Sequence, residues 1–272
     1  MAWMSEVDVG EQHALVRNDR LGSIHWNSGR WLLQSGEFEK WENTSRGQFW
    51  LQGTVGTGKS CLTSIIINHL IENHTDGRLA FFYCSRGSTN SNLMAVLRSI
   101  LSQLSVAADG LVVAEEIKSR YDDEAIRCTT GSHLSSDECV TLLAHLIGLH
   151  GNTVIVIDAL DECEQPKGLL RHLKQVWDRS QKLKLFFSSR LDVPVCEIFP
   201  DSDIVRIDSS TNAQDIFLYI KGELEKPERR NAGVISPELA ERMVKVLEKR
   251  AQGMLVYRSN MRHLLLTISR FR

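Results

Sequence analysis

The chain contains, at residues 53–60, the segment Gly53-Thr54-Val55-Gly56-Thr57-Gly58-Lys59-Ser60. This segment matches the pattern G-x-x-x-x-G-K-[ST], which is a phosphate-binding loop. Its glycines allow backbone conformations that a Cβ atom would forbid, so that successive N–H groups converge on phosphate oxygens. We expect Lys59 to reach the β- and γ-phosphates and the Ser60 hydroxyl to ligate Mg²⁺. The segment and the following Cys61 are therefore predicted to bind a nucleoside triphosphate with its magnesium ion.

A strand and a helix flank this loop, as a phosphate-binding loop requires. Beyond it, short β-rich runs alternate with longer helical patterns, which is typical of an α/β fold with a mostly parallel sheet. The predicted strands are Gln48–Gln52, Leu79–Cys84, Thr153–Ile157, Leu183–Ser188 and Ile204–Ile207. The predicted helices between them are Lys59–His74, Asn90–Val106, Leu111–Tyr121, Leu134–His150 and Lys167–Ser180. Several of these strands are continuously apolar, so we expect helices on both faces of a five-stranded sheet.

The composition places the chain among ordinary globular proteins. Of its 272 residues, 42% are hydrophobic and 24% are charged, which excludes wholesale disorder and permits one large domain or two modest ones. The net charge of −2 argues against a dedicated binder of nucleic acid or of an anionic membrane. The apolar runs are too short to span a bilayer. No secretory signal opens the sequence and the cysteines form no CxxC pair, so we expect free thiols and a cytoplasmic protein.

The patterns divide the chain into three parts. Residues 1–45 are predicted to be a lead-in that begins irregularly and then becomes helical, with tryptophans that pack onto the sheet edge rather than stack on nucleic-acid bases. Residues 46–208 form the sheet-based core. Residues 209–272 form a helical appendage that begins with a helix over Thr211–Lys226.

An acidic segment follows the most apolar of the predicted strands. Asp158 stands at the carboxyl end of Val154–Ile157, where ligands bind in open α/β sheets, and is the candidate carboxylate for Mg²⁺. Either Glu162 or Asp161 would polarise the attacking water as general base. The stretch between Lys59 and Asp158 leaves room for a further strand, and no N-K-x-D motif is present. These two features disfavour a GTPase.

A third polar strand end is Ser188-Ser189-Arg190, which follows the run Leu183–Phe187. Parallel strands bring their carboxyl ends to the same edge of a sheet, so Arg190 would face the nucleotide. An arginine at that place is able to sense or neutralise charge on the γ-phosphate. The other interpretation is an ordinary surface arginine, and this element alone does not decide between the two.

Taken together, these segments resemble a known family. The resemblance is carried by the tryptophan-rich piece at residues 31–41, the strand and loop at 49–60, the acidic run Val154–Cys163 and the strand end Phe187–Arg190. They are similar to NACHT-type NTPases, and more narrowly to the nephrocystin-like N-terminal NTPase module of fungal NOD-like receptor proteins. The resemblance implies a P-loop NTPase three-layer sandwich and a signal-transduction ATPase. Such an ATPase switches between a closed ADP form and an open, oligomerising ATP form.

The resemblance also implies roles for single residues. The loop would bind ATP or ADP, Asp158 would hold Mg²⁺, and Arg190 would be the sensor. Asp161 and Glu162 would form the hydrolytic acidic pair, acting with Lys59 on the phosphates. The implied partners are further copies of the chain or full-length homologues.

Two other functions stay open. Family members usually add an effector domain and C-terminal repeats, so a truncated, non-catalytic receptor fragment that acts by protein association is one alternative. A small-molecule kinase is the weaker one, because neither an arginine-rich lid nor an acceptor pocket can be identified. The histidines lack metal-ligand spacing and are expected on helix or loop surfaces. Cys163, next to the predicted site, is expected to be a small packing residue, since no base partner for it can be identified.

Overall fold

Five parallel strands form the sheet of the computed structural model, which describes residues 7–17, 29–73, 77–87, 91–105, 134–208, 211 and 215. The strand order is β2-β3-β4-β1-β5, and all neighbours in this order run parallel. The strands are β1 (Gly47–Gly53), β2 (Arg78–Tyr83), β3 (Thr153–Asp158), β4 (Leu183–Ser189) and β5 (Asp203–Ile207). Each lies within about one residue of its predicted range at both ends, so the α/β prediction is confirmed.

Helices precede the first strand and connect the others. They are α1 (Val9–Val16), α2 (Arg30–Leu33), α3 (Gly36–Asn43), α4 (Lys59–Asn73), α5 (Leu93–Ser105), α7 (Ser136–His150), α8 (Pro166–Arg179) and α9 (Val195–Ile198), with a 3₁₀ turn η2 (Leu160–Glu162). The helices predicted at 111–121 and 211–226 lie outside the described residues, apart from positions 211 and 215. None of the helices within the described ranges has both the length and the apolar character that crossing a membrane requires.

The prediction that the lead-in begins irregularly was wrong at α1. Its first turn is capped by Asp8, whose carboxylate accepts a hydrogen bond from the backbone N–H of Glu11 (2.9 Å). The helix is then held on the fold through His13, which lies 2.8 Å from the Tyr83 hydroxyl and 3.1 Å from the side-chain oxygen of Asn68. A helix this short gains its stability from such tertiary contacts, which no local pattern reveals.

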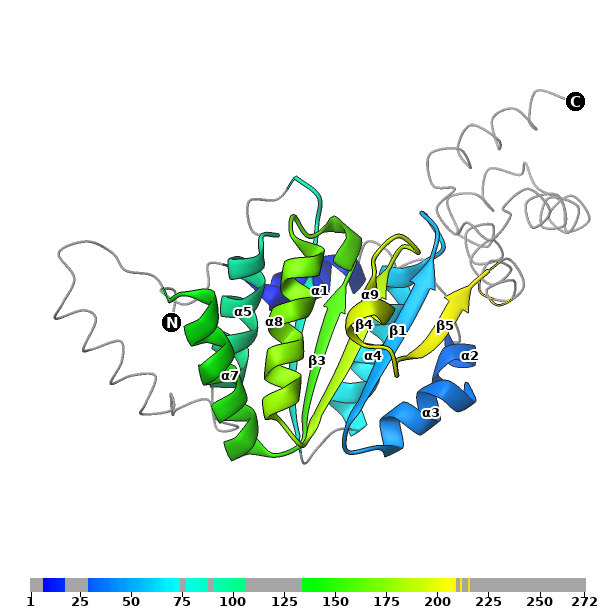
Figure 1. The fold of residues 1–272 in the computed structure, drawn as a ribbon. Helices are drawn as coiled ribbons and strands as arrows, with labels where there is room; N and C mark the ends of the chain where they lie inside the picture. Colours follow the sequence, from blue (N-terminus) through cyan, green and yellow to red (C-terminus); the bar gives the residue numbers. More distant parts are fainter. Residues whose placement is uncertain are drawn as a thin grey trace, which may run out of the picture.

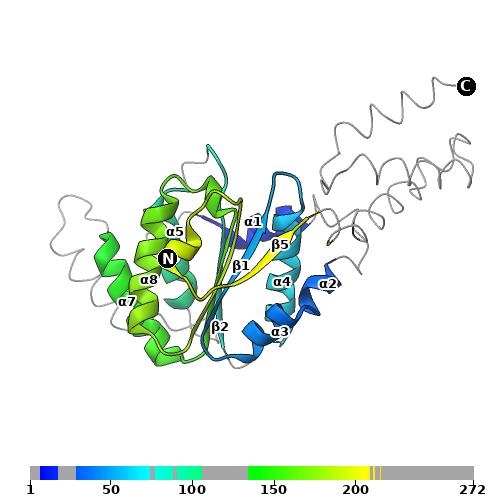
Figure 2. The same cartoon turned by 45° about the vertical axis from the view of Figure 1, so that its right-hand side comes forward.

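The sheet lies between two layers of helices, as Figures 1 and 2 show. Along β3, Val154 and Val156 belong to the core that α3 and α4 cover, whereas Ile155 and Ile157 belong to the core that α5, α7 and α8 cover. All four residues are fully buried. This explains why the run is continuously apolar instead of alternating, and it confirms the three-layer sandwich.

The helical lead-in packs beside the edge strand β5. Phe38 and Trp41 of α3 are fully buried, and their ring centroids lie 5.8 Å and 5.9 Å from that of Phe49. The ammonium group of Lys184 lies 5.3 Å from the centre of the Trp41 ring, a cation–π contact. The Trp41 indole also donates a hydrogen bond to the carbonyl of Gly47 (3.2 Å). Trp41 is therefore a core residue, as predicted from the sequence.

The lead-in also contacts Asp215, which follows the last strand in the sequence. The Asp215 carboxylate accepts hydrogen bonds from the backbone N–H of Gly29 (2.9 Å) and from the indole N–H of Trp31 (2.8 Å). Burial raises the pKa of Asp215, and these two hydrogen bonds act in the opposite direction. The start of the predicted appendage is thus attached to the lead-in, although the boundary between residues 208 and 209 stays a prediction.

Replacing Trp41 by alanine is expected to lower the free energy of unfolding by about 3–5 kcal/mol, because it leaves a large cavity among packed rings. Urea denaturation followed by circular dichroism measures this change. The control is Leu149→Ala, a substitution of an exposed residue that is expected to change stability by less than about 0.5 kcal/mol. If the two variants are equally stable, the lead-in is not part of the cooperative fold.

Candidate functional site

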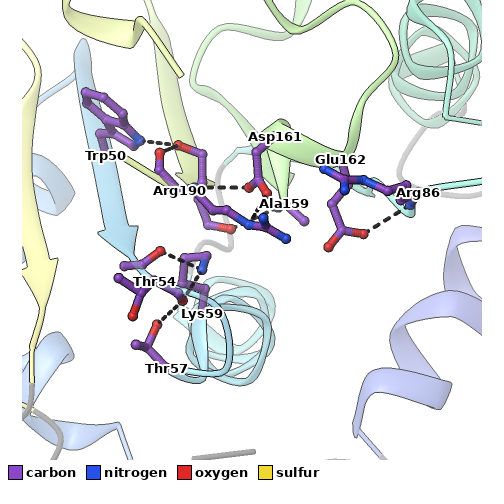
Figure 3. Close-up of polar contacts among 12 residues, drawn as sticks. Trp50, Thr54, Thr57, Lys59, Arg86, Ala159, Asp161, Glu162 and Arg190 are labelled. Atoms are coloured by element: carbon purple, nitrogen blue, oxygen red, sulfur yellow. Dashed lines mark hydrogen bonds and ion pairs between the residues drawn. The ribbon is translucent and has the colours of Figure 1, made fainter. Parts of the chain in front are cut away.

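The candidate site lies at the carboxyl edge of the sheet, where β1, β4 and β3 are consecutive neighbours. The glycine-rich loop follows β1, Arg190 follows β4, and Asp158 is the last residue of β3. Figure 3 shows Lys59, Asp161 and Arg190 drawn together at this edge. Segments that are far apart in the sequence meet here because parallel strands end on the same side.

The loop has the backbone geometry that its glycines were predicted to supply. Gly56 and Gly58 have φ angles of 78° and 92°, which side chains with a Cβ atom rarely adopt. Gly53 is required for a different reason, because a Cβ atom at this position would lie 2.5 Å from the Thr57 hydroxyl oxygen. Thr57 is itself buried and donates a hydrogen bond to the carbonyl of Thr54 (2.9 Å). The loop is therefore closed by a hydrogen bond between its own residues.

Lys59 begins α4 and points back at this loop. Its ammonium group donates to the carbonyls of Gly53 and Thr54, both at 2.8 Å. Burial lowers the pKa of Lys59. The nearby carboxylates of Asp161, Asp158 and Glu162 raise it, and the Arg190 charge lowers it. These charges act on Lys59 only because the three polar strand ends converge on one place.

The Asp158 carboxylate is almost completely buried, at 2% exposure. One of its oxygens accepts hydrogen bonds from the Thr63 hydroxyl of α4 (2.8 Å) and the Ser188 hydroxyl of β4 (2.5 Å). The Ser188 oxygen in turn accepts the backbone N–H of Ala159 (2.9 Å). Sequence reasoning missed Thr63, although its place one helical turn after Lys59 puts it on the same face of α4.

The turn after β3 carries Asp161 and Glu162 and directs their side chains to different neighbours. Ala159 adopts the left-handed conformation (φ 51°, ψ 48°), and its carbonyl accepts the N–H of Glu162 (2.7 Å). Asp161 then faces β4, where its two oxygens accept the backbone N–H of Arg190 (3.0 Å) and its Nε–H (2.9 Å). The Asp161 side chain is only 5% exposed, so it is a buried clamp on Arg190.

Glu162 faces the opposite direction, toward the end of β2. Its Oε2 atom accepts a hydrogen bond from the backbone N–H of Arg86 (3.0 Å), as Figure 3 shows. The residue is partly exposed. The structure therefore gives two adjacent carboxylates different surroundings, which the sequence left undecided.

The remaining predicted ligands occupy the loop tip and the first turn of α4. Val55 is 57% exposed, and Ser60 and Cys61 are partly exposed. Among the described residues, no three His, Cys, Asp or Glu side chains are grouped to hold a metal ion. Magnesium nonetheless fits Ser60 and Asp158, because it commonly takes one or two protein oxygens and completes its shell with phosphates and water.

Comparison with known proteins gives a family match over the residues of this site. The family model described as "Nephrocystin 3, N-terminal" matches residues 27–190, a range that includes the loop, Asp158 and Arg190. The vegetative incompatibility protein HET-E-1 of Podospora anserina is 29% identical over 175 residues, which cover 62% of this chain. The match spans only 13% of the length of that relative.

Solved structures with a similar chain course include the Walker-type ATPase of Pyrococcus abyssi, with a TM-score of 0.41 and 16% identity over 89% of this chain and 73% of that one. Domain III of the replication initiation protein DnaA of Thermotoga maritima gives a TM-score of 0.41 and 13% identity, over 88% of this chain and 91% of that one. The family match, in contrast, is one of sequence and covers more than half of the chain. The chain therefore belongs to the nephrocystin 3 N-terminal family, a NACHT-type NTPase module.

Proposed function

We propose that the chain binds ATP and ADP with Mg²⁺ and hydrolyses ATP slowly, as the nucleotide switch of a fungal incompatibility-type receptor. The observation that supports this most directly is the convergence of Lys59, Arg190 and three carboxylates beside the closed glycine loop. A loop of this geometry presents backbone N–H groups to phosphate oxygens.

In this proposal the loop and Lys59 bind the phosphates of the nucleotide. Ser60 and Asp158 would hold the magnesium ion, which when bound neutralises charge on the β- and γ-phosphates. Thr63 and Ser188 position the Asp158 carboxylate for this role through their hydrogen bonds.

Glu162 is the better candidate for the general base. Both carboxylate oxygens of Asp161 are already engaged with Arg190, and the side chain is buried. Glu162 is partly exposed, and only its Oε2 atom accepts the Arg86 N–H. Glu162 would take a proton from the attacking water while the water oxygen bonds to the γ-phosphorus and the bond to ADP breaks.

Asp161 acts instead as a positioning residue for Arg190. It accepts the backbone N–H and the Nε–H of the arginine, and the two Nη groups are the ones that would contact a phosphate. An arginine held in this way loses less side-chain freedom when it contacts a γ-phosphate.

We extend the proposal to partners and location. Self-association or association with full-length homologues is the proposed output of the switch. The described cysteines are all free thiols, which suits a reducing compartment such as the cytoplasm.

Lys59→Ala is expected to weaken ATP binding about 10- to 100-fold, because it removes a charge-assisted contact worth about 1.5–3 kcal/mol. Isothermal titration calorimetry with ATP and ADP measures the affinity. Lys174→Ala is the matched control, since that lysine pairs with Asp178 on the surface of α8. Equal affinity of wild type and Lys59→Ala would rule out the proposed nucleotide site.

Glu162→Gln is expected to keep ATP affinity within about twofold and to slow hydrolysis about 10²- to 10⁴-fold, the usual range for loss of a general base. Release of inorganic phosphate measures the turnover. Glu164→Gln serves as control, because this exposed carboxylate lies two residues further along. Unchanged turnover in Glu162→Gln would assign the base to another group.

The effects of Asp161→Asn and Arg190→Ala on the activation free energy of ATP hydrolysis are expected to be coupled by about 1–3 kcal/mol, because each variant removes the same contact. A double-mutant cycle measures this coupling, and the double variant should be little slower than Arg190→Ala alone. Asp178→Asn should leave the rate unchanged. Additive effects would mean that Asp161 acts on the reaction independently of Arg190.

A further inference from the structure

The ends of β2 and β3 are joined by a series of hydrogen bonds beyond the last strand pair. The backbone N–H of Cys84 donates to the carbonyl of Asp158 (3.0 Å), and the N–H of Arg86 donates to the Glu162 carboxylate (3.0 Å). Further along, the N–H of Glu164 donates to the carbonyl of Ser91 (3.1 Å). Cys84, Arg86 and Ser91 therefore lie along the turn that carries Glu162.

This arrangement brings two free cysteines together. Cys84 and Cys163 are 5% and 6% exposed, belong to the same core, and are joined by a hydrogen bond between their side chains. Cys84 follows β2 directly, and Cys163 follows Glu162 directly. The expectation that Cys163 only fills space is therefore incomplete, because its partner is a second thiol.

We propose that Cys84 and Cys163 form an oxidation site, at which a hydroperoxide converts the two thiols reversibly into a disulfide that displaces Glu162. The displacement of Glu162 rests on the proposed function, since it takes Glu162 as the base of ATP hydrolysis. The formation of the disulfide depends only on the contact between the two thiols. A disulfide between Cys84 and Cys163 would link the residue that follows β2 to the residue that follows Glu162. This link would lie next to the hydrogen bond between Arg86 and Glu162.

The chemistry is balanced with one equivalent of hydroperoxide. The Cys163 thiolate attacks the peroxide oxygen, the O–O bond breaks, and a sulfenic acid forms with release of hydroxide or alkoxide. The Cys84 sulfur then attacks the sulfenic sulfur, the S–S bond forms, the S–O bond breaks, and the Cys84 proton leaves with the hydroxyl group as water. Two thiols lose two electrons in total, and the peroxide gains them.

The surroundings of the two sulfurs suit Cys163 as the attacking group. The hydrogen bond from Cys84 lowers the pKa of Cys163 to about 7, against the opposing effect of burial. Cys139, buried in α7, is different, because burial raises its pKa to about 11. Cys139 is therefore the natural internal control for oxidation of a buried thiol.

The first experiment tests the site without any use of ATP. The full reduced chain is treated with equimolar hydrogen peroxide, alkylated, digested and mapped by mass spectrometry. We expect a cross-linked peptide containing Cys84 and Cys163 that dithiothreitol removes, while Cys139 is recovered alkylated. In Cys84→Ser the cross-link should be lost and Cys163 should stop at the sulfenic acid, or reach the sulfinic acid when a second equivalent of peroxide is added, whereas Cys139→Ser should keep the cross-link. Absence of the cross-link in a folded wild-type chain would overturn the proposal.

The second experiment tests the effect on Glu162. Oxidised wild type should hydrolyse ATP at least about fivefold more slowly than the reduced chain, and dithiothreitol should restore the rate. Cys84→Ser should not show this reversible loss. A mapped cross-link with an unchanged rate would overturn the displacement of Glu162. If the reduced chain hydrolyses no ATP, the proposed function fails while the cross-link result still decides the oxidation site.

Discussion

The Asp158 carboxylate is almost fully buried, and a buried carboxylate is costly unless hydrogen-bond donors surround it. Here the donors come from two other elements, Thr63 on the helix that begins at Lys59 and Ser188 on the strand that leads to Arg190. These two hydrogen bonds therefore link the acidic strand end both to the helix that follows the loop and to the strand that leads to Arg190. The residue proposed to hold magnesium is also the one that aligns the site.

The site collects charge locally without a basic surface. The chain as a whole carries a net charge of −2, yet Lys59 and Arg190 lie among three carboxylates at one edge of the sheet. Phosphate recognition by such a loop depends mainly on backbone N–H groups and the start of a helix, which contribute nothing to the formal charge. Overall composition therefore does not report on a site of this kind, whereas the local spacing of glycines does.

Patterns of neighbouring residues predicted those features that depend on neighbouring residues. The run Val154–Ile157 predicted a strand because both faces of β3 are covered, and the loop motif predicted the left-handed glycines at 56 and 58. The clamp between Asp161 and Arg190 and the contact between Cys84 and Cys163 could not be predicted. Each joins residues on different strand ends, and their meeting depends on the strand order of the sheet, which no spacing along the chain encodes.

The division of roles between the two acids follows from the turn that carries them. Ala159 adopts a left-handed conformation that costs about 1–2 kcal/mol for a residue with a Cβ atom. This cost is offset by hydrogen bonds at both sides of the residue, from its N–H to Ser188 and from the N–H of Glu162 to its carbonyl. The 3₁₀ turn that follows rotates successive side chains by about 120°, so adjacent acids cannot face the same neighbour. Asp161 therefore reaches Arg190 at the end of β4, and Glu162 reaches Arg86 after the end of β2. The rotation of the turn that Ala159 begins thus separates the carboxylate that holds Arg190 from the one proposed as general base.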